Sequence, residues 1–173
     1  METGNKLKRV TVIGAVAAVA AGVSLIGPVA SAATAPTCQT RDFRIRKVND
    51  QGALGTYLIG IAYRNITKST CTTNGFPGVT LYSHGRKLVV ATRQHDAHFS
   101  AIQIRPGRRV FGVVSYLHFP SPGHRCRAVT GLGVYAPNST QFVRFSIRRG
   151  DVYCSAATVY PLATSVNGSV SGR

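Results

Sequence analysis

The chain is poor in acidic residues and contains no tryptophan. Its 173 residues include five Asp and Glu against 21 Lys and Arg, and the one glutamate, Glu2, lies at the N-terminus. Glycosidases use two carboxyl groups about 5 to 10 Å apart, and none of the four aspartates has an obvious partner. A G-x-S-x-G nucleophile elbow is also missing. We therefore expect no enzyme, and the alternative is a secreted hydrolase whose active site is dispersed over distant loops.

Metal-binding spacings are missing as well. The cysteines form no C-x-x-C or C-x-x-H spacing, so a zinc site built on them is not expected. The one cluster with ligand chemistry runs from His95 to His98, where a loop would have to bring the two histidines and Asp96 together. We expect solvated histidines there, and hence no metal and no other cofactor.

The N-terminal segment has the three parts of a secretory signal peptide. A positive stretch precedes an uncharged apolar run over 10–26, a Gly-Pro pair follows at 27–28, and an A-x-A cleavage site follows at 30–32. An uncleaved membrane anchor is the alternative, because the run of 17 residues reaches the lower limit for spanning a bilayer. The small-residue site at the right distance favours cleavage. The positive residues are Lys6, Lys8 and Arg9.

Cleavage would leave a secreted or cell-surface chain of 141 residues, which is enough for one domain. We assign 1–32 to the signal peptide, 33–163 to a single domain, and the small, polar residues 164–173 to a disordered tail. Lipid anchoring is not expected, because the residues before Cys38 lack the Leu-small-small pattern of a lipoprotein signal. Export makes disulfides the expected state of the cysteines.

Short apolar runs alternate with turn residues along the rest of the chain. Runs rich in Val, Ile, Tyr and Phe recur about every 8 to 12 residues between Gly, Pro and Asn, which is typical of an all-β protein. Apolar residues on both faces of 57–65 predict a central strand. Hairpins are expected to join 79–82 to 87–92 and 99–104 to 110–117. The other predicted strands are 42–48, 132–135, 142–147 and 158–162.

Eight or so short antiparallel strands need a second layer to bury their apolar faces. The fold class that we expect is therefore all-β, an antiparallel two-sheet β-sandwich of immunoglobulin-like type. A closed β-barrel is the alternative.

The hairpin pattern also selects a disulfide pairing. Cys38 precedes the first strand and Cys71 follows the second, so an antiparallel pair of these strands brings the two cysteines together at its open end. Cys126 and Cys154 are likewise centred on Thr140, inside the turn predicted over 137–140. We therefore predict the pairs Cys38–Cys71 and Cys126–Cys154, each closing a loop of about 30 residues.

The basic residues predict an anionic partner. Beyond the signal peptide the chain keeps 18 Lys and Arg, 15 of them Arg, against four Asp, and this charge attracts anionic polymers and surfaces. Many of the arginines lie at turns, and loops at one end of a sandwich can form one surface. We expect a binding or structural module that engages an anionic cell-wall polymer or a membrane surface. The candidate anion-binding residues are Arg105, Arg108, Arg109, Arg125, Arg127, Arg148 and Arg149.

Other partners are not expected. Nucleic acid is disfavoured because export places the chain outside the cell, and because stacking aromatics are not interleaved with the arginines. No small-molecule ligand is identifiable from the sequence, and we expect a monomer.

Several segments match one known family. The most specific is the glycine-aromatic-proline-glycine run at 75–78, four residues after Cys71, and weaker matches are 63–65, 105–107 and 132–135. From Cys38 to Leu162 the chain resembles the actinobacterial exported family 4232 of the domains of unknown function. The resemblance implies an exported β-sandwich, and it implies no catalytic residue.

Overall fold

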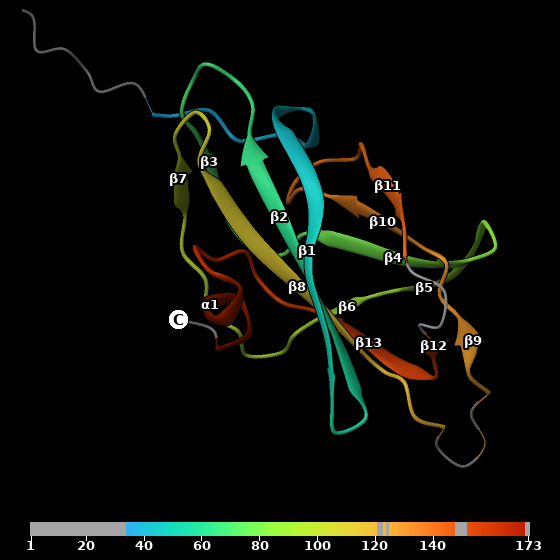
Figure 1. The fold of residues 1–173 in the computed structure, drawn as a ribbon. Helices are drawn as coiled ribbons and strands as arrows, with labels where there is room; N and C mark the ends of the chain where they lie inside the picture. Colours follow the sequence, from blue (N-terminus) through green and yellow to red (C-terminus); the bar gives the residue numbers. More distant parts are fainter. Residues whose placement is uncertain (1–33, 121–122, 124, 148–151, 172–173) are drawn as a thin grey trace, which may run out of the picture. The chain divides into compact units, whose positions relative to one another are not determined.

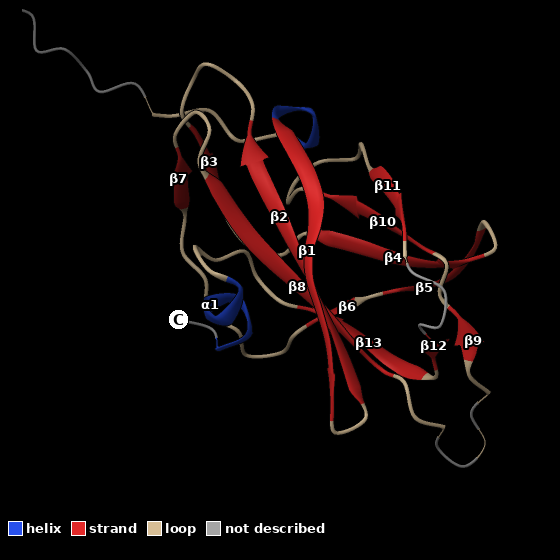
Figure 2. Ribbon diagram, in the orientation of Figure 1, coloured by secondary structure: helices blue, strands red, loops and turns tan. Residues whose placement is uncertain are grey.

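Strands make up nearly all of the regular structure (Figure 2). The computed structural model describes residues 34–120, 123, 125–147 and 152–171; the predicted signal peptide, Arg148 and Arg149 lie outside them. The strands are β1 (Phe43–Ala53), β2 (Thr56–Asn65), β3 (Cys71–Thr73), β4 (Gly78–Ser83), β5 (Arg86–Val90), β6 (Thr92–Arg93), β7 (Ile102–Ile104), β8 (Arg109–Leu117), β9 (Arg127–Ala128), β10 (Gly131–Tyr135), β11 (Val143–Ser146), β12 (Val152–Tyr153) and β13 (Ser155–Val159). A 3₁₀ turn, η1 (Thr40–Asp42), precedes β1, and a short helix, α1 (Val166–Ser171), follows β13.

Two main sheets form the sandwich. The first sheet has the strand order β1-β2-β8-β13-β6, and the second has the order β11-β10-β4-β5 (Figure 1). Two-stranded ribbons, β12-β9 and β3-β7, extend them. The predicted two-sheet β-sandwich is confirmed, and the described strands close no barrel. Pairing is antiparallel except between β13 and β6, which run parallel.

The core lies between the inner faces of the two sheets. Along β2, Ile59, Ile61 and Tyr63 are fully buried, which is the period of two expected for one face of a strand. Leu81 of β4 and Leu132 of β10 are fully buried in the same apolar cluster. The predicted central position of β2 is confirmed, because it pairs with β1 on one side and β8 on the other.

One predicted hairpin is wrong. The run at 99–104 does not pair with 110–117: β7 pairs with β3, and β8 pairs with β2 and β13. The reason lies at the end of β2, where the buried Asn65 donates from its side-chain amide to the carbonyl of Ile104. Asn65 also exchanges backbone hydrogen bonds with the turn, donating to Arg108 and accepting from Gly107. These bonds hold the turn against β2, so β8 continues along β2 instead of folding back on β7.

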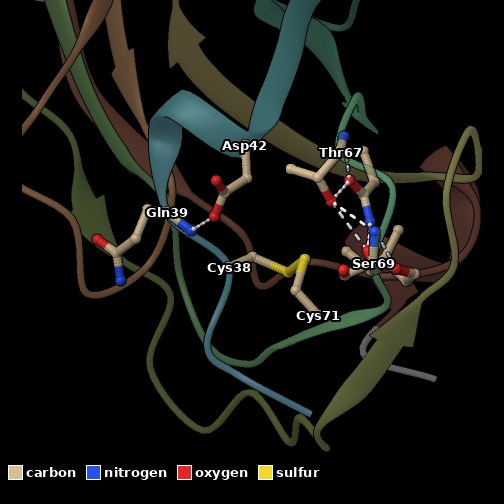
Figure 3. The surroundings of a disulfide bond; sticks show 8 residues. Cys38, Gln39, Asp42, Thr67, Ser69 and Cys71 are labelled. Atoms are coloured by element: carbon tan, nitrogen blue, oxygen red, sulfur yellow. Dashed lines mark hydrogen bonds between the residues drawn. A yellow bond between two sulfur atoms is a disulfide. The ribbon is translucent and has the colours of Figure 1, made fainter.

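The structure contains both predicted disulfides, Cys38–Cys71 and Cys126–Cys154. The first joins the segment before β1 to β3, just beyond the open end of the β1–β2 hairpin (Figure 3). The second closes the β9–β12 ribbon, which continues the β10–β11 hairpin away from its tip. Two disulfides indicate that the protein matures in an oxidising environment.

The C-terminal segment differs from the sequence prediction. The residues assigned to a disordered tail contain helix α1, which packs against β8. Ser165 accepts a hydrogen bond from the Gly168 amide, as a residue at a helix N-terminus does. Buried Ser169 donates from its hydroxyl to the carbonyl of Pro161. Two side-chain hydrogen bonds to the backbone therefore order a segment whose composition alone indicated disorder.

Candidate anion-binding face

Three arginines stand side by side across the outer face of the first sheet. The register places Arg44 of β1 directly opposite Arg64 of β2, and Arg64 directly opposite Arg109 of β8. All three side chains are exposed, whereas their neighbours in the chain, such as Tyr63 and Val110, are buried in the core. Because side chains alternate between the two faces of a strand, the buried neighbours direct the arginines outward. We call these three residues the arginine row.

Two adjoining hollows extend the row. One, of about 130 Å³, has Val48 and Ala62 between its arginines, and the other, of about 610 Å³, lies along the β7–β8 turn and the start of β8. Arg109 lines both hollows, so they meet at this residue. We call this surface the arginine face; its arginines are Arg44, Arg46, Arg64, Arg105, Arg108 and Arg109.

The β7–β8 turn is fixed against the row. Arg64 donates from Nε to the carbonyl of Gly107 at 3.1 Å, and the Arg108 amide donates to the Arg105 carbonyl across the turn. Gly107 has a φ of +75°, a conformation that costs glycine little and other residues much more. The turn arginines are therefore held beside the strand arginines.

Nothing acidic neutralises this face among the described residues. The salt bridge between Lys47 and Asp50 lies elsewhere, because these residues stand opposite the core-facing Ile61 and Ile59 of β2. Asp42, the acid nearest to Arg44 in sequence, accepts the Gln39 amide with Oδ2 at 2.7 Å (Figure 3). Like charges directly opposite each other in a sheet are destabilising. The arginine row is thus a local concentration of positive charge, and the repulsion within it lowers the stability of the fold.

The predicted anion-binding residues are not one patch. Arg105, Arg108 and Arg109 belong to the arginine face, whereas Arg127 lies in β9, beyond the opposite end of β8. Cys154, which is bonded to Cys126, donates its amide to Leu117, so Arg125 and Arg127 lie near the far end of that strand. Nine residues of β8 span about 26 Å. Arg148 and Arg149 lie outside the described residues.

Sequence reasoning missed the strand arginines. The alternation of Arg44 and Arg46 with buried Phe43 and Ile45 showed that they point away from the core. It did not show that Arg64 and Arg109 would stand beside them, because that depends on the register of β2 with β1 and β8.

The histidine segment lies on the surface. His95, Asp96 and His98 are exposed, and within the described ranges no three His, Cys, Asp or Glu side chains come together as metal ligands. The described part of the chain also holds no helix with the length and apolar character needed to span a bilayer.

Comparison with known proteins identifies the family. The model of the family described as "Domain of unknown function (DUF4232)" matches residues 38–163, and the chain belongs to this family. No curated protein matches the chain. One similar solved structure is a beta-glucosidase from Kluyveromyces marxianus, at 9% identity and a TM-score of 0.36. That match covers 67% of this chain and 15% of the beta-glucosidase chain.

Proposed function

We propose that this member of the DUF4232 family is an exported binding module that holds an anionic cell-wall polymer on its arginine face. The observation that carries the proposal is the arginine row, in which Arg64 has an arginine directly opposite it on each side. The signal-peptide pattern at residues 1–32 and the two disulfides support an extracellular location.

A repeating anion relieves the repulsion that the row creates. Arginine presents a planar fork of donors that matches phosphate and carboxylate groups in bidentate geometry. Bound anions would place negative charge between guanidinium groups that otherwise repel each other. A row that costs stability in the free protein would therefore contribute to affinity in the complex.

The dimensions of the face favour a polymer over a single small anion. Three adjacent strands place the ends of the row about 10 Å apart, and the second hollow extends the surface along the β7–β8 turn. Each exposed ion pair contributes little by itself. Several such contacts along one chain would add up to useful, strongly salt-dependent binding.

The hydrolase alternative has less support. Glycoside hydrolysis needs two carboxyl groups facing a substrate, and Asp42 and Asp50 are each engaged by a neighbour in their own segment. Asp50 additionally accepts the Tyr57 hydroxyl. These acids serve the fold, so we propose binding without catalysis.

Cosedimentation with purified cell walls tests the proposal. The probe is wall material before and after acid extraction of its phosphodiester polymers, incubated with the mature chain. Arg44→Gln, Arg64→Gln and Arg109→Gln together should weaken binding at least tenfold at low salt and flatten its salt dependence. The matched control carries Arg86→Gln, Arg93→Gln and Arg127→Gln, which change the net charge equally on strands β5, β6 and β9.

The outcomes separate the alternatives. Equal losses of wall binding in the two triple variants would contradict a specific binding face and would indicate that binding depends only on net charge. Undiminished binding to extracted walls would contradict the anionic polymer as the ligand. Release of soluble wall fragments during the incubation would favour the hydrolase.

A further inference from the structure

An apolar tip lies at the opposite end of the first sheet from the arginine row. The β1–β2 hairpin ends in Leu54 and Gly55, and the segment after β8 places Phe119 beside them. These residues and Leu117 line an open hollow of about 480 Å³. Leu54 is fully exposed and Phe119 is 61% exposed. We call Leu54, Gly55, Leu117 and Phe119 the apolar tip.

The backbone holds Leu54 outward at a conformational cost. Leu54 has a φ of +46° and Gly55 a φ of +82°. Two-residue hairpin turns of this kind favour Asn or Gly, because a Cβ at positive φ is crowded by the backbone. A leucine at this position therefore has neither a conformational nor a packing benefit for the fold.

Backbone hydrogen bonds of the adjacent residues place Phe119 beside the hairpin. The His118 amide donates to the Gly55 carbonyl, and Thr56 pairs with Leu117 in the sheet. A Cβ added to Gly55 would come within 3.0 Å of the Phe119 ring, so the ring packs closely on the turn. Two chain segments thus present two large apolar side chains together.

Two exposed cations lie on the segment that is linked to the tip residue Leu117. Arg125 and Arg127 are exposed and flank Cys126, whose disulfide partner Cys154 donates its amide to Leu117. Apolar side chains with basic residues close by match the bilayer interface, where the acyl boundary accepts the apolar groups and anionic headgroups attract the cations. A second copy of this strongly basic chain would be repelled, which disfavours self-association through the tip.

We infer that the apolar tip inserts into the interface of an anionic lipid bilayer, with Leu54 and Phe119 as the inserted side chains. This site is separate from the arginine row, since the extended chain from Gly55 to Arg64, with residues 56–63 of β2 between them, spans about 30 Å. The inference therefore does not depend on the proposed polymer binding.

Tryptophan fluorescence tests the inference, because the wild-type chain has no tryptophan and gives no background. Phe119→Trp in the mature chain should show a blue shift on adding vesicles of phosphatidylglycerol and phosphatidylcholine in equal parts. Ile66→Trp is the matched control, an exposed apolar position just beyond the other end of β2, and its emission should not shift. No shift at Phe119→Trp, or equal shifts at both positions, would overturn the inference.

A second variant separates insertion from electrostatic adsorption. Leu54→Asn suits the positive φ and removes the apolar side chain, so the variant should fold at least as well as the wild type. Its partition onto the same vesicles should be weaker by about tenfold or more. Unchanged partition would contradict insertion and indicate adsorption by charge alone. Phe119→Trp combined with Arg44→Gln, Arg64→Gln and Arg109→Gln should still show the blue shift. Membrane insertion can therefore be tested even if the arginine face does not bind polymer.

Discussion

Replacing Arg64 with threonine should have a more favourable effect on the stability of the folded domain at low salt than at high salt, although it deletes a charged residue and a hydrogen bond. Arg64 stands between Arg44 and Arg109 in adjacent strands, so its removal relieves both like-charge contacts of the row. Threonine is well suited to an exposed strand position. The variant also loses the bond from Arg64 Nε to the Gly107 carbonyl, which acts in the opposite direction.

The two effects differ in their salt dependence. Opposed residues in a sheet have Cβ atoms about 5 Å apart, and two unit charges about 5.5 Å apart in water repel by about 0.75 kcal/mol. Two such contacts amount to about 1.5 kcal/mol without salt, about 1.2 kcal/mol at 10 mM and about 0.2 kcal/mol at 1 M, given the respective screening lengths. The lost hydrogen bond costs about 0.5 to 1.5 kcal/mol, and this cost changes little with salt concentration.

The change in unfolding free energy caused by Arg64→Thr should therefore fall by about 1 kcal/mol between 10 mM and 1 M salt. Urea titrations followed by circular dichroism measure it, with Arg86→Thr as the control. Arg86 lies in β5 opposite Ser83, so the control has the same charge change without an opposed arginine. If the salt dependence of Arg64→Thr is no larger than that of Arg86→Thr, the row does not repel itself, and the main support for the polymer site is lost.

Two further predictions concern stability. Burial raises the pKa of Tyr63 well above its usual value, and its hydroxyl has no hydrogen-bond partner among the described residues. Tyr63→Phe should thus raise the free energy of unfolding by about 1 kcal/mol at neutral pH. The difference in unfolding free energy between Tyr63→Phe and the wild type should grow by about 1.4 kcal/mol per pH unit above about 10, because the Tyr63 hydroxyl ionises there only in the unfolded wild-type chain. If urea denaturation gives the same difference at neutral and alkaline pH, this prediction is refuted. The disulfides Cys38–Cys71 and Cys126–Cys154 close loops with separations of 33 and 28 residues. Removing them by double Cys→Ala substitution should lower the free energy of unfolding by about 3.7 and 3.6 kcal/mol respectively. A loss below about 1 kcal/mol in chemical denaturation of either variant would contradict the loop-closure argument.

Local patterns were sufficient for the parts of the fold that depend on neighbours in the chain. The β10–β11 hairpin formed around the turn predicted at 137–140, where Asn138 adopts a φ of +59°. The β4–β5 hairpin formed likewise. Because the two cysteine pairs flank the β1–β2 and β10–β11 hairpins, the disulfide pairing could be predicted from the hairpin pattern.

Long-range register was beyond the sequence. Arg44 and Arg109 belong to strands far apart in the chain, and they share a face because β2 pairs with both strands. The alternation along a single strand does not contain that information. The prediction therefore named arginines at turns, and the structure places these turns at two ends of the sheet about 26 Å apart. Helix α1 was missed for a different reason: its stabilising bonds, from the Gly168 amide to Ser165 and from the Ser169 hydroxyl to the Pro161 carbonyl, lie in a segment whose small, polar composition indicates disorder.

The positive charge of the arginine face depends more on the shortage of acidic residues than on the number of arginines. Asp50 is bound to Lys47 and Tyr57 on the core side of β1, and Asp42 is bound to Gln39 at the start of that strand. Both acids lie in or beside the strand that carries Arg44 and Arg46, yet both are engaged away from the outer face. An added acid on that face would convert the row into an ordinary cross-strand ion pair. Arg44→Glu should therefore stabilise the domain at low salt and weaken wall binding together, and a variant that stabilised the fold while retaining binding would show that the ligand contacts some other surface.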